Sequence, residues 1–180
     1  PEKAIKLEKD ALAQIENITA DNARLVSNLH ANLGGLYRMN GHPDLAREHM
    51  EKSISLLDQF NLLHINDSIP QIANYAMFLT EQQEPERGIS ELQKLSGIIK
   101  EYHSDDCLDY AKVQETLGTI YLMTANLPQA KTHFKRAFKI YEKIWADEPE
   151  MIEAKYQEIQ ELYPQIGFCI GKKLSGLLTK

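Results

Sequence analysis

The apolar residues of this chain recur at spacings of three and four, and small residues stand at fixed places within that pattern. Over residues 114–137 the pattern predicts two helices joined by a turn at residues 126–128. Their expected inner faces carry Leu117, Gly118 and Tyr121 on the first helix and Ala130, Phe134 and Ala137 on the second. Gly118 and Ala130 are small enough for a close crossing, with Tyr121 and Phe134 buried on either side. This stretch therefore predicts a helix hairpin.

The hairpin pattern repeats along the chain at an interval of 42 residues. A small residue stands at each corresponding position: Ala76 and Gly34 for Gly118, and Gly88, Ala46 and Ala4 for Ala130. Units that each bury an apolar face on the next one form solenoids. We therefore expect an all-α fold, a right-handed α-solenoid (superhelix) of antiparallel helix hairpins.

The period also sets the expected domain organisation, a single helical-repeat domain over residues 1–180 that starts in the middle of a repeat. We expect its parts to be a second helix at about 2–18, repeats at about 20–60, 67–102 and 104–146, and a degenerate terminal repeat at about 150–179. Asp67 with Ser68, and residues 104–106, are the expected helix caps. An apolar stripe over 166–178 predicts a terminal helix that caps the solenoid or docks another repeat or a second protomer.

The spacing of these small and large residues resembles the tetratricopeptide repeat, and the 42-residue period is similar to that of kinesin light chains. The resemblance implies a non-catalytic scaffold for protein–protein interaction, in which the first helix of each repeat lines a concave groove. In that family an asparagine before the small-residue position often contacts the backbone of an extended peptide. Here Asn32 and Asn74 occupy this position, and Thr116 interrupts the row in the third repeat.

A side-chain amide suits such a groove because it offers both hydrogen-bond donors and acceptors to any peptide backbone. Methionine adds an adaptable apolar contact, and Gly35 is expected to face the groove one turn after Asn32. The predicted groove residues are Asn28, Asn32, Arg38, Met39, Asn74, Met77, Lys112, Glu115, Thr119 and Met123. The carboxylate clamp with which some relatives hold chaperone tails is disfavoured, because only Asn74 and Lys112 match its five positions.

Charge and cysteine content narrow the classes of partner. With a formal net charge of −6 and no basic stripe recognised, we expect neither nucleic acid nor an anionic membrane as the partner. Cys107 and Cys169 are too few for a disulfide framework, and no apolar run is long enough to span a bilayer. These features favour a cytoplasmic protein that binds a protein or peptide.

Candidate chemical sites are weak in this sequence. The glycines of residues 167–173 have the wrong spacing for a phosphate-binding loop, and residues 103–107 fit a helix cap better than a metal site. We therefore expect no catalytic residue, no metal and no cofactor. Two alternatives to a scaffold stay open: a sensory or regulatory part of a larger signalling protein, and homo-oligomerisation through the terminal helices.

Overall fold

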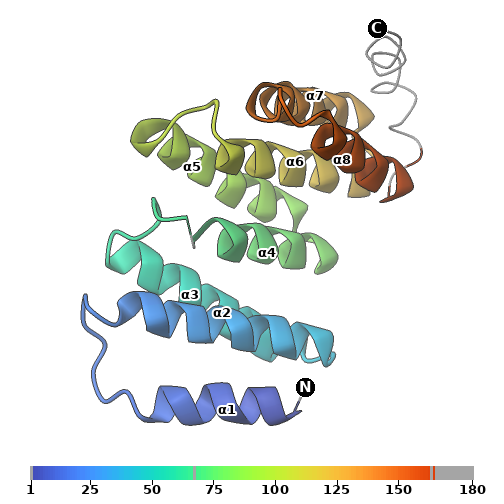
Figure 1. Cartoon of the computed structure of the whole chain (residues 1–180). Helices are drawn as coiled ribbons and strands as arrows, with labels where there is room; N and C mark the ends of the chain where they lie inside the picture. The colour runs from blue at the N-terminus through green and yellow to red at the C-terminus, as the bar shows by residue number, and fades with distance from the viewer. Residues whose placement is uncertain (1, 67, 163, 165–180) are drawn as a thin grey trace, which may run out of the picture. The chain divides into compact units, whose positions relative to one another are not determined.

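The computed structural model describes residues 2–66, 68–162 and 164 (Figure 1). All the regular elements in these ranges are helices: α1 (Glu2–Ala13), α2 (Ala23–Met39), α3 (Pro43–Gln59), α4 (Ser68–Glu81), α5 (Pro85–Tyr102), α6 (Leu108–Met123), α7 (Leu127–Ile144) and α8 (Pro149–Leu162). The all-α prediction is therefore confirmed. The terminal helix expected over 166–178 lies outside the described residues.

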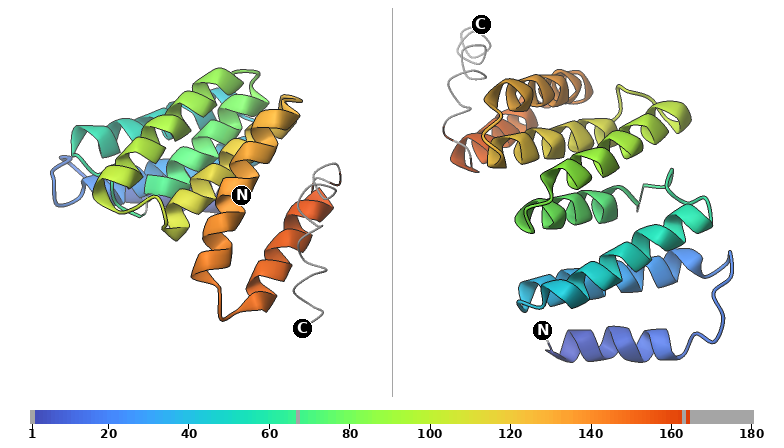
Figure 2. Two further views of the ribbon diagram at one scale, coloured as in Figure 1. Left: turned by 90° about the horizontal axis from the view of Figure 1, so that it is seen from above. Right: turned by 180° about the vertical axis from the view of Figure 1, so that it is seen from behind.

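The helices form two compact units, Pro1–Tyr102 and His103–Lys180. In the first unit α2 pairs with α3 and α4 pairs with α5, while α1 packs on α2 and α3 packs on α4. Figure 2 shows α2 and α3 running side by side in opposite directions. In the second unit α6 pairs with α7, and α8 contacts α7. A single domain over the whole chain stays a prediction.

Glycines let the paired helices approach closely, as their positions in the pattern predict. A Cβ on Gly118 would lie 2.8 Å from the ring of Phe134, and one on Gly34 would lie 2.6 Å from Cγ of Met50. Phe134 is fully buried, as expected. Tyr121 is only half-buried, because its ring stacks on His133 at the edge of the hairpin, with 5.3 Å between centroids. The expectation of a fully buried Tyr121 was wrong.

Several helix ends differ from the sequence prediction. The first helix ends at Ala13 and not near residue 18, because Asn22 organises the following loop. Its side-chain oxygen accepts a hydrogen bond from the Thr19 amide at 2.8 Å, and its side-chain nitrogen donates to the Asn17 carbonyl at 2.9 Å. These local bonds replace the helical ones.

Two predicted caps are also replaced. Ser68 is the first residue of α4, and its hydroxyl is directed at the carbonyl of Leu63, 2.6 Å away; Asp67 lies outside the described residues. At α6 the cap is Cys107, whose sulfur accepts from the Tyr110 amide at 3.4 Å. Ser104 instead accepts a hydrogen bond from the Asp106 amide within the preceding turn. Several neighbouring polar residues could cap each helix, and their spacing in the sequence did not show which one does.

Candidate functional site

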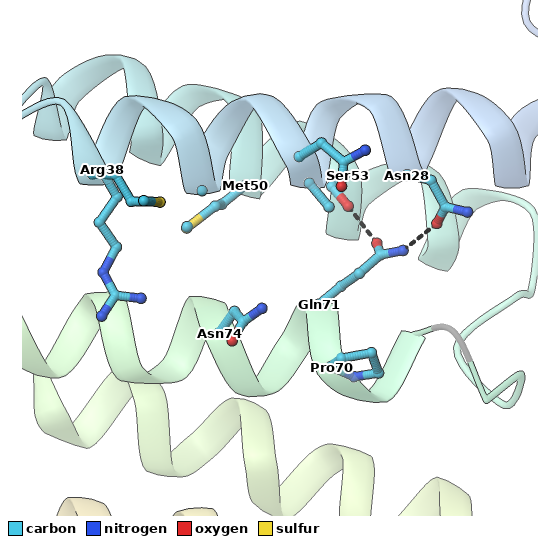
Figure 3. Close-up of a pocket in the computed structure, with 11 residues that line it drawn as sticks. Asn28, Arg38, Met50, Ser53, Pro70, Gln71 and Asn74 are labelled. Carbon is cyan, nitrogen blue, oxygen red and sulfur yellow. Dashed lines mark hydrogen bonds between the residues drawn. The ribbon is translucent and has the colours of Figure 1, made fainter. Parts of the chain in front are cut away.

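A groove of about 490 Å³ opens in the first unit, with α2 on one side and α4 on the other (Figure 3). Its lining comes from three helices: Asn28, Ala31, Asn32, Gly35, Arg38 and Met39 of α2, Met50 and Ser53 of α3, and Pro70, Gln71 and Asn74 of α4. The groove thus contains six positions expected from the sequence, the five predicted groove residues Asn28, Asn32, Arg38, Met39 and Asn74 together with Gly35.

Helix geometry explains why α2 presents this face. The lining residues of α2 recur at intervals of three and four, while Val26, Leu33 and Tyr37 on its other side are buried. Gly35 leaves the backbone bare at the middle of the groove, and a Cβ there would meet nothing within 4 Å. The floor therefore has room for an approaching chain at this point.

Gln71 is held in the groove by a buried polar network. Its side-chain oxygen accepts a hydrogen bond from Ser53 Oγ at 2.5 Å, and its nitrogen donates to Asn28 Oδ1 at 2.5 Å (Figure 3). The same oxygen also accepts from Ser27 Oγ at 2.8 Å. Ser27 and Ser53 are almost fully buried. Because buried hydroxyls are costly to leave unpaired, this network fixes the orientation of the Gln71 amide.

The two asparagines expected to bind a peptide differ in their surroundings. Asn74 is exposed, and within the described residues its side chain makes no hydrogen bond. Asn32 donates to Glu8 Oε1 of α1 at 3.0 Å, so one of its donors already has a partner. Asn74 is therefore the more available amide of the two.

Arg38, at one end of the groove, forms an ion pair with Glu81, so the two charges cancel. Arg38 donates through Nε to Glu81 Oε2 at 2.8 Å, and its second guanidinium nitrogen bonds the other carboxylate oxygen. Bidentate pairs of this kind hold both side chains in one orientation. Beside the pair, Met39 is 81% exposed. The groove therefore offers amides and thioethers, with its one cation already paired.

The remaining predicted residues do not line this groove. Met77 is half-buried elsewhere on α4, and Lys112, Glu115, Thr119 and Met123 belong to the second unit. The carboxylate of Glu115 is already engaged, since it accepts from the Tyr141 hydroxyl at 2.6 Å and pairs with Lys155 at 2.9 Å. Burial, together with Glu115, raises the pKa of Tyr141 well above its ordinary value. Glu115 therefore holds α6, α7 and α8 together.

Part of the chain matches a known protein family. The family model for the tetratricopeptide repeat matches residues 68–143. Residues 68–143, which span α4 to α7, thus match the tetratricopeptide repeat. Repeats of this kind generally mediate protein–protein interactions and are typically non-catalytic.

A solved structure extends the likeness over most of the chain. BtubC (BKLC) from P. vanneervenii, which has a kinesin light chain-like tetratricopeptide fold, is similar with a TM-score of 0.74 and 19% sequence identity. The match covers 92% of this chain and 66% of BtubC, so the chain spans about two thirds of that protein. At this identity the likeness shows the fold, an all-α helical-repeat solenoid. No curated protein matches the sequence.

The described residues contain no cluster that could bind a metal ion. Within them, no three His, Cys, Asp or Glu side chains gather in a way that could hold a metal ion. At the turn before α6, Asp106 pairs with Lys143, and the hydrogen bond from that ammonium lowers the pKa of the carboxyl group. Residues 167–173 lie outside the described part. No helix in the described residues is long and apolar enough to cross a bilayer.

Five residues of the groove were not among those predicted from the sequence: Ala31, Met50, Ser53, Pro70 and Gln71. Gln71 carried a detectable signal, because it precedes Asn74 by three residues and so shares its helix face. Met50 and Ser53 lie on α3, the second helix of its hairpin, whereas the groove was expected to be lined by first helices alone. Met50 packs against Gly34 of α2, where a Cβ would lie 2.6 Å from the Met50 Cγ.

Proposed function

We propose that this protein is a non-catalytic scaffold that binds an extended segment of a partner protein in the groove between α2 and α4. The observation that carries the proposal is the set of side-chain amides along one groove: Asn28, Asn32, Gln71 and Asn74. An extended peptide presents backbone donors and acceptors at every residue, about 3.3 Å apart, and amides can pair with either kind. These backbone hydrogen bonds do not depend on which side chains the peptide carries.

The groove combines a fixed part with an available part. Gln71 is immobilised by Ser27 and Ser53, so little conformational entropy is lost there when a ligand binds. Asn74 has no internal partner within the described residues and provides the new hydrogen bonds. Met39, which is exposed, adds an apolar contact that adapts to different side chains. We therefore expect loose specificity, with moderate affinity.

The absence of an unpaired charge in the groove bears on the kind of peptide. Arg38 is neutralised by Glu81, and the other lining residues are uncharged. A strongly charged segment would lose its hydration without gaining an ion pair there. The groove therefore favours a segment whose central residues are uncharged.

The proposal is tested with peptides selected on the wild-type protein from a displayed library of random 12-residue sequences. We expect Asn74→Ala to weaken their binding several-fold, because a net hydrogen bond contributes about 0.5–1.5 kcal/mol. Asn32→Ala should have a smaller effect, since Glu8 already occupies one of its donors. Fluorescence anisotropy titrations measure both.

Lys52→Ala is the matched control, because Lys52 is an exposed residue of α3 that does not line the groove. It should leave the affinity unchanged. Circular dichroism should show equal helix content in all three variants. Peptides that bind both asparagine variants as tightly as the wild type would mean that this groove is not the binding site.

A further inference from the structure

The second helix of the third hairpin, α7, has a charge unlike that of its counterparts. It carries five basic side chains, Lys131, Lys135, Arg136, Lys139 and Lys143, and one acidic residue, Glu142. At the corresponding places, α5 has equal numbers of acidic and basic residues, and α3 has an excess of acidic ones. The net charge of −6 had concealed this basic helix, and the expectation that the chain has no basic stripe was wrong.

Four of the lysines form one continuous surface, which we call the lysine face: Lys131, Lys135, Lys139 and Lys143. They follow each other at intervals of four residues, so the face extends about 18 Å along the helix at 1.5 Å per residue. The buried residues of α7, centred on Ala130, Phe134 and Tyr141, lie on the opposite side. Lys135, Lys139 and Lys143 are exposed, and Lys131 is half-buried.

Most of this charge is not compensated within the described residues. Lys143 pairs with Asp106, but no carboxylate lies within ion-pair distance of Lys131, Lys135 or Lys139 there. Glu142, the acidic residue of α7, accepts a hydrogen bond from the Tyr156 hydroxyl at 3.2 Å. Within the described residues, Lys131, Lys135 and Lys139 thus form no ion pair, although Lys139 lies close enough to Asp106 to help lower the pKa of its carboxyl group.

This arrangement works against the stability of the helix. Like charges four residues apart repel each other by about 0.2–0.5 kcal/mol per pair, and the lysine face contains three such pairs. Among these lysines only Lys143, in the last turn, gains from the helix dipole. A bound anionic partner would remove this repulsion and gain ion pairs at the same time.

We propose that the lysine face of α7 docks an acidic segment of a partner protein. The site is separate from the α2–α4 groove, and neither proposal depends on the other. A membrane or a duplex nucleic acid presents negative charge over a much larger area than an 18 Å face. The chain outside α7 is more acidic than the whole and would be repelled by such a surface within a Debye length of about 8–10 Å. A short acidic segment contacts only the lysine face.

The probe is a labelled 16-residue Ala/Gln peptide with four glutamates spaced four residues apart. We expect binding at about 50 mM salt that weakens as salt is raised. The variant with Lys131→Gln, Lys135→Gln and Lys139→Gln should bind on the order of ten-fold more weakly, at a few-fold per lost charge contact. The control carries Lys52→Gln, Lys94→Gln and Lys100→Gln, the same loss of charge on α3 and α5, and should stay within two-fold of the wild type.

Four outcomes would overturn the proposal. They are no binding of the peptide to the wild type at about 50 mM salt, equal weakening in the control, loss of binding in Asn74→Ala, and tighter binding of phosphatidylserine vesicles or a 20-nucleotide oligonucleotide than of the peptide. Unfolding curves identify any variant that is not folded. For such a variant, the single substitution Lys135→Gln gives the same comparison, with an expected two- to four-fold loss.

Discussion

The first and third hairpins contain the same stacked ring pair 84 residues apart: Tyr37 on His49, with centroids 5.4 Å apart, and Tyr121 on His133, at 5.3 Å. The residue that contacts the histidine of each pair differs between the two hairpins. His49 Nδ1 lies 2.9 Å from Nδ1 of His30, whereas His133 Nδ1 lies 2.9 Å from Oε1 of Gln114. His30 and Gln114 are also 84 residues apart. The contact thus occupies the same position in both hairpins, but its partner is a histidine in the first and a glutamine in the third.

That substitution determines how each hairpin responds to acid. Two facing ring nitrogens can share only one proton, so the hydrogen bond between them persists only while at least one of the two rings stays neutral. Burial, then the neighbouring His49 and Lys52, lowers the pKa of His30 to about 4, against the effect of Glu48. Burial also lowers the pKa of His49 and of His133. Only the first hairpin places two such histidines together.

The largest expected effect tests whether the two hairpins also share their packing. Phe134 and Met50 occupy corresponding positions and are both buried, each against a glycine of the facing helix. Phe134→Ala should cost about 3–5 kcal/mol and Met50→Ala about 2–5 kcal/mol of unfolding free energy. Chemical denaturation measures both. A loss below about 1 kcal/mol for Phe134→Ala would show that the register is wrong.

The acid response of the histidine pair is the next largest effect. Between pH 6.5 and about 4 the unfolded chain binds more protons than the folded one, so the free energy of unfolding falls as pH falls. Because both rings are partly exposed, we expect His30 to account for about 1–2 kcal/mol of this loss. Unfolding at pH 7 and pH 4.5 measures it.

Exchanging the residues at positions 30 and 114 gives the control for the predicted acid response. His30→Gln gives the first hairpin the side chain of the third and should reduce its loss of stability in acid. Gln114→His makes the reverse change and should increase the loss. If neither variant changes the difference between the two pH values, the histidine pair is not the acid-sensitive element.

The smallest expected effect is the difference in stability between alanine substitutions at two adjacent glycines of α2. A Cβ on Gly35 meets nothing within 4 Å, so Gly35→Ala should stabilise the helix by about 0.5–1 kcal/mol. A Cβ on Gly34 would lie 2.6 Å from Met50 Cγ and 3.3 Å from the Ala46 carbonyl oxygen, so Gly34→Ala should destabilise it. Thermal unfolding of both variants measures the difference. Equal shifts would mean that the α2–α3 crossing is looser than described.

The fold could be predicted because its determinants are periodic. Gly34, Gly118 and Phe134 lie at spacings that only a helix crossing explains, and the interval of 42 gives the successive repeats. The groove face of α2 was expected from the resemblance to the tetratricopeptide repeat, which implied Asn32, and helical spacing then added Asn28 and Gly35.

Contacts between side chains distant in sequence could not be predicted in this way. The bond from Gln71 to Ser53 spans 18 residues and the bond from Asn32 to Glu8 spans 24, and neither leaves a periodic signal. The contacts of Glu115 were not predicted for the same reason, since its partners lie on α7 and α8. The lysine face was periodic, but the net charge of the chain hid it.

The central claim, that side-chain amides of the α2–α4 groove hold a peptide backbone, is tested most directly by nuclear magnetic resonance. A library-selected peptide is titrated into ¹⁵N-labelled protein, and the side-chain amide signals are assigned from the spectra of Asn74→Ala and Asn32→Ala. We expect the Asn74 and Asn32 side-chain signals to shift in proportion to occupancy, with the Gln71 signal also perturbed. Saturation of binding with these signals unmoved, and shifts confined to other helices, would contradict the account.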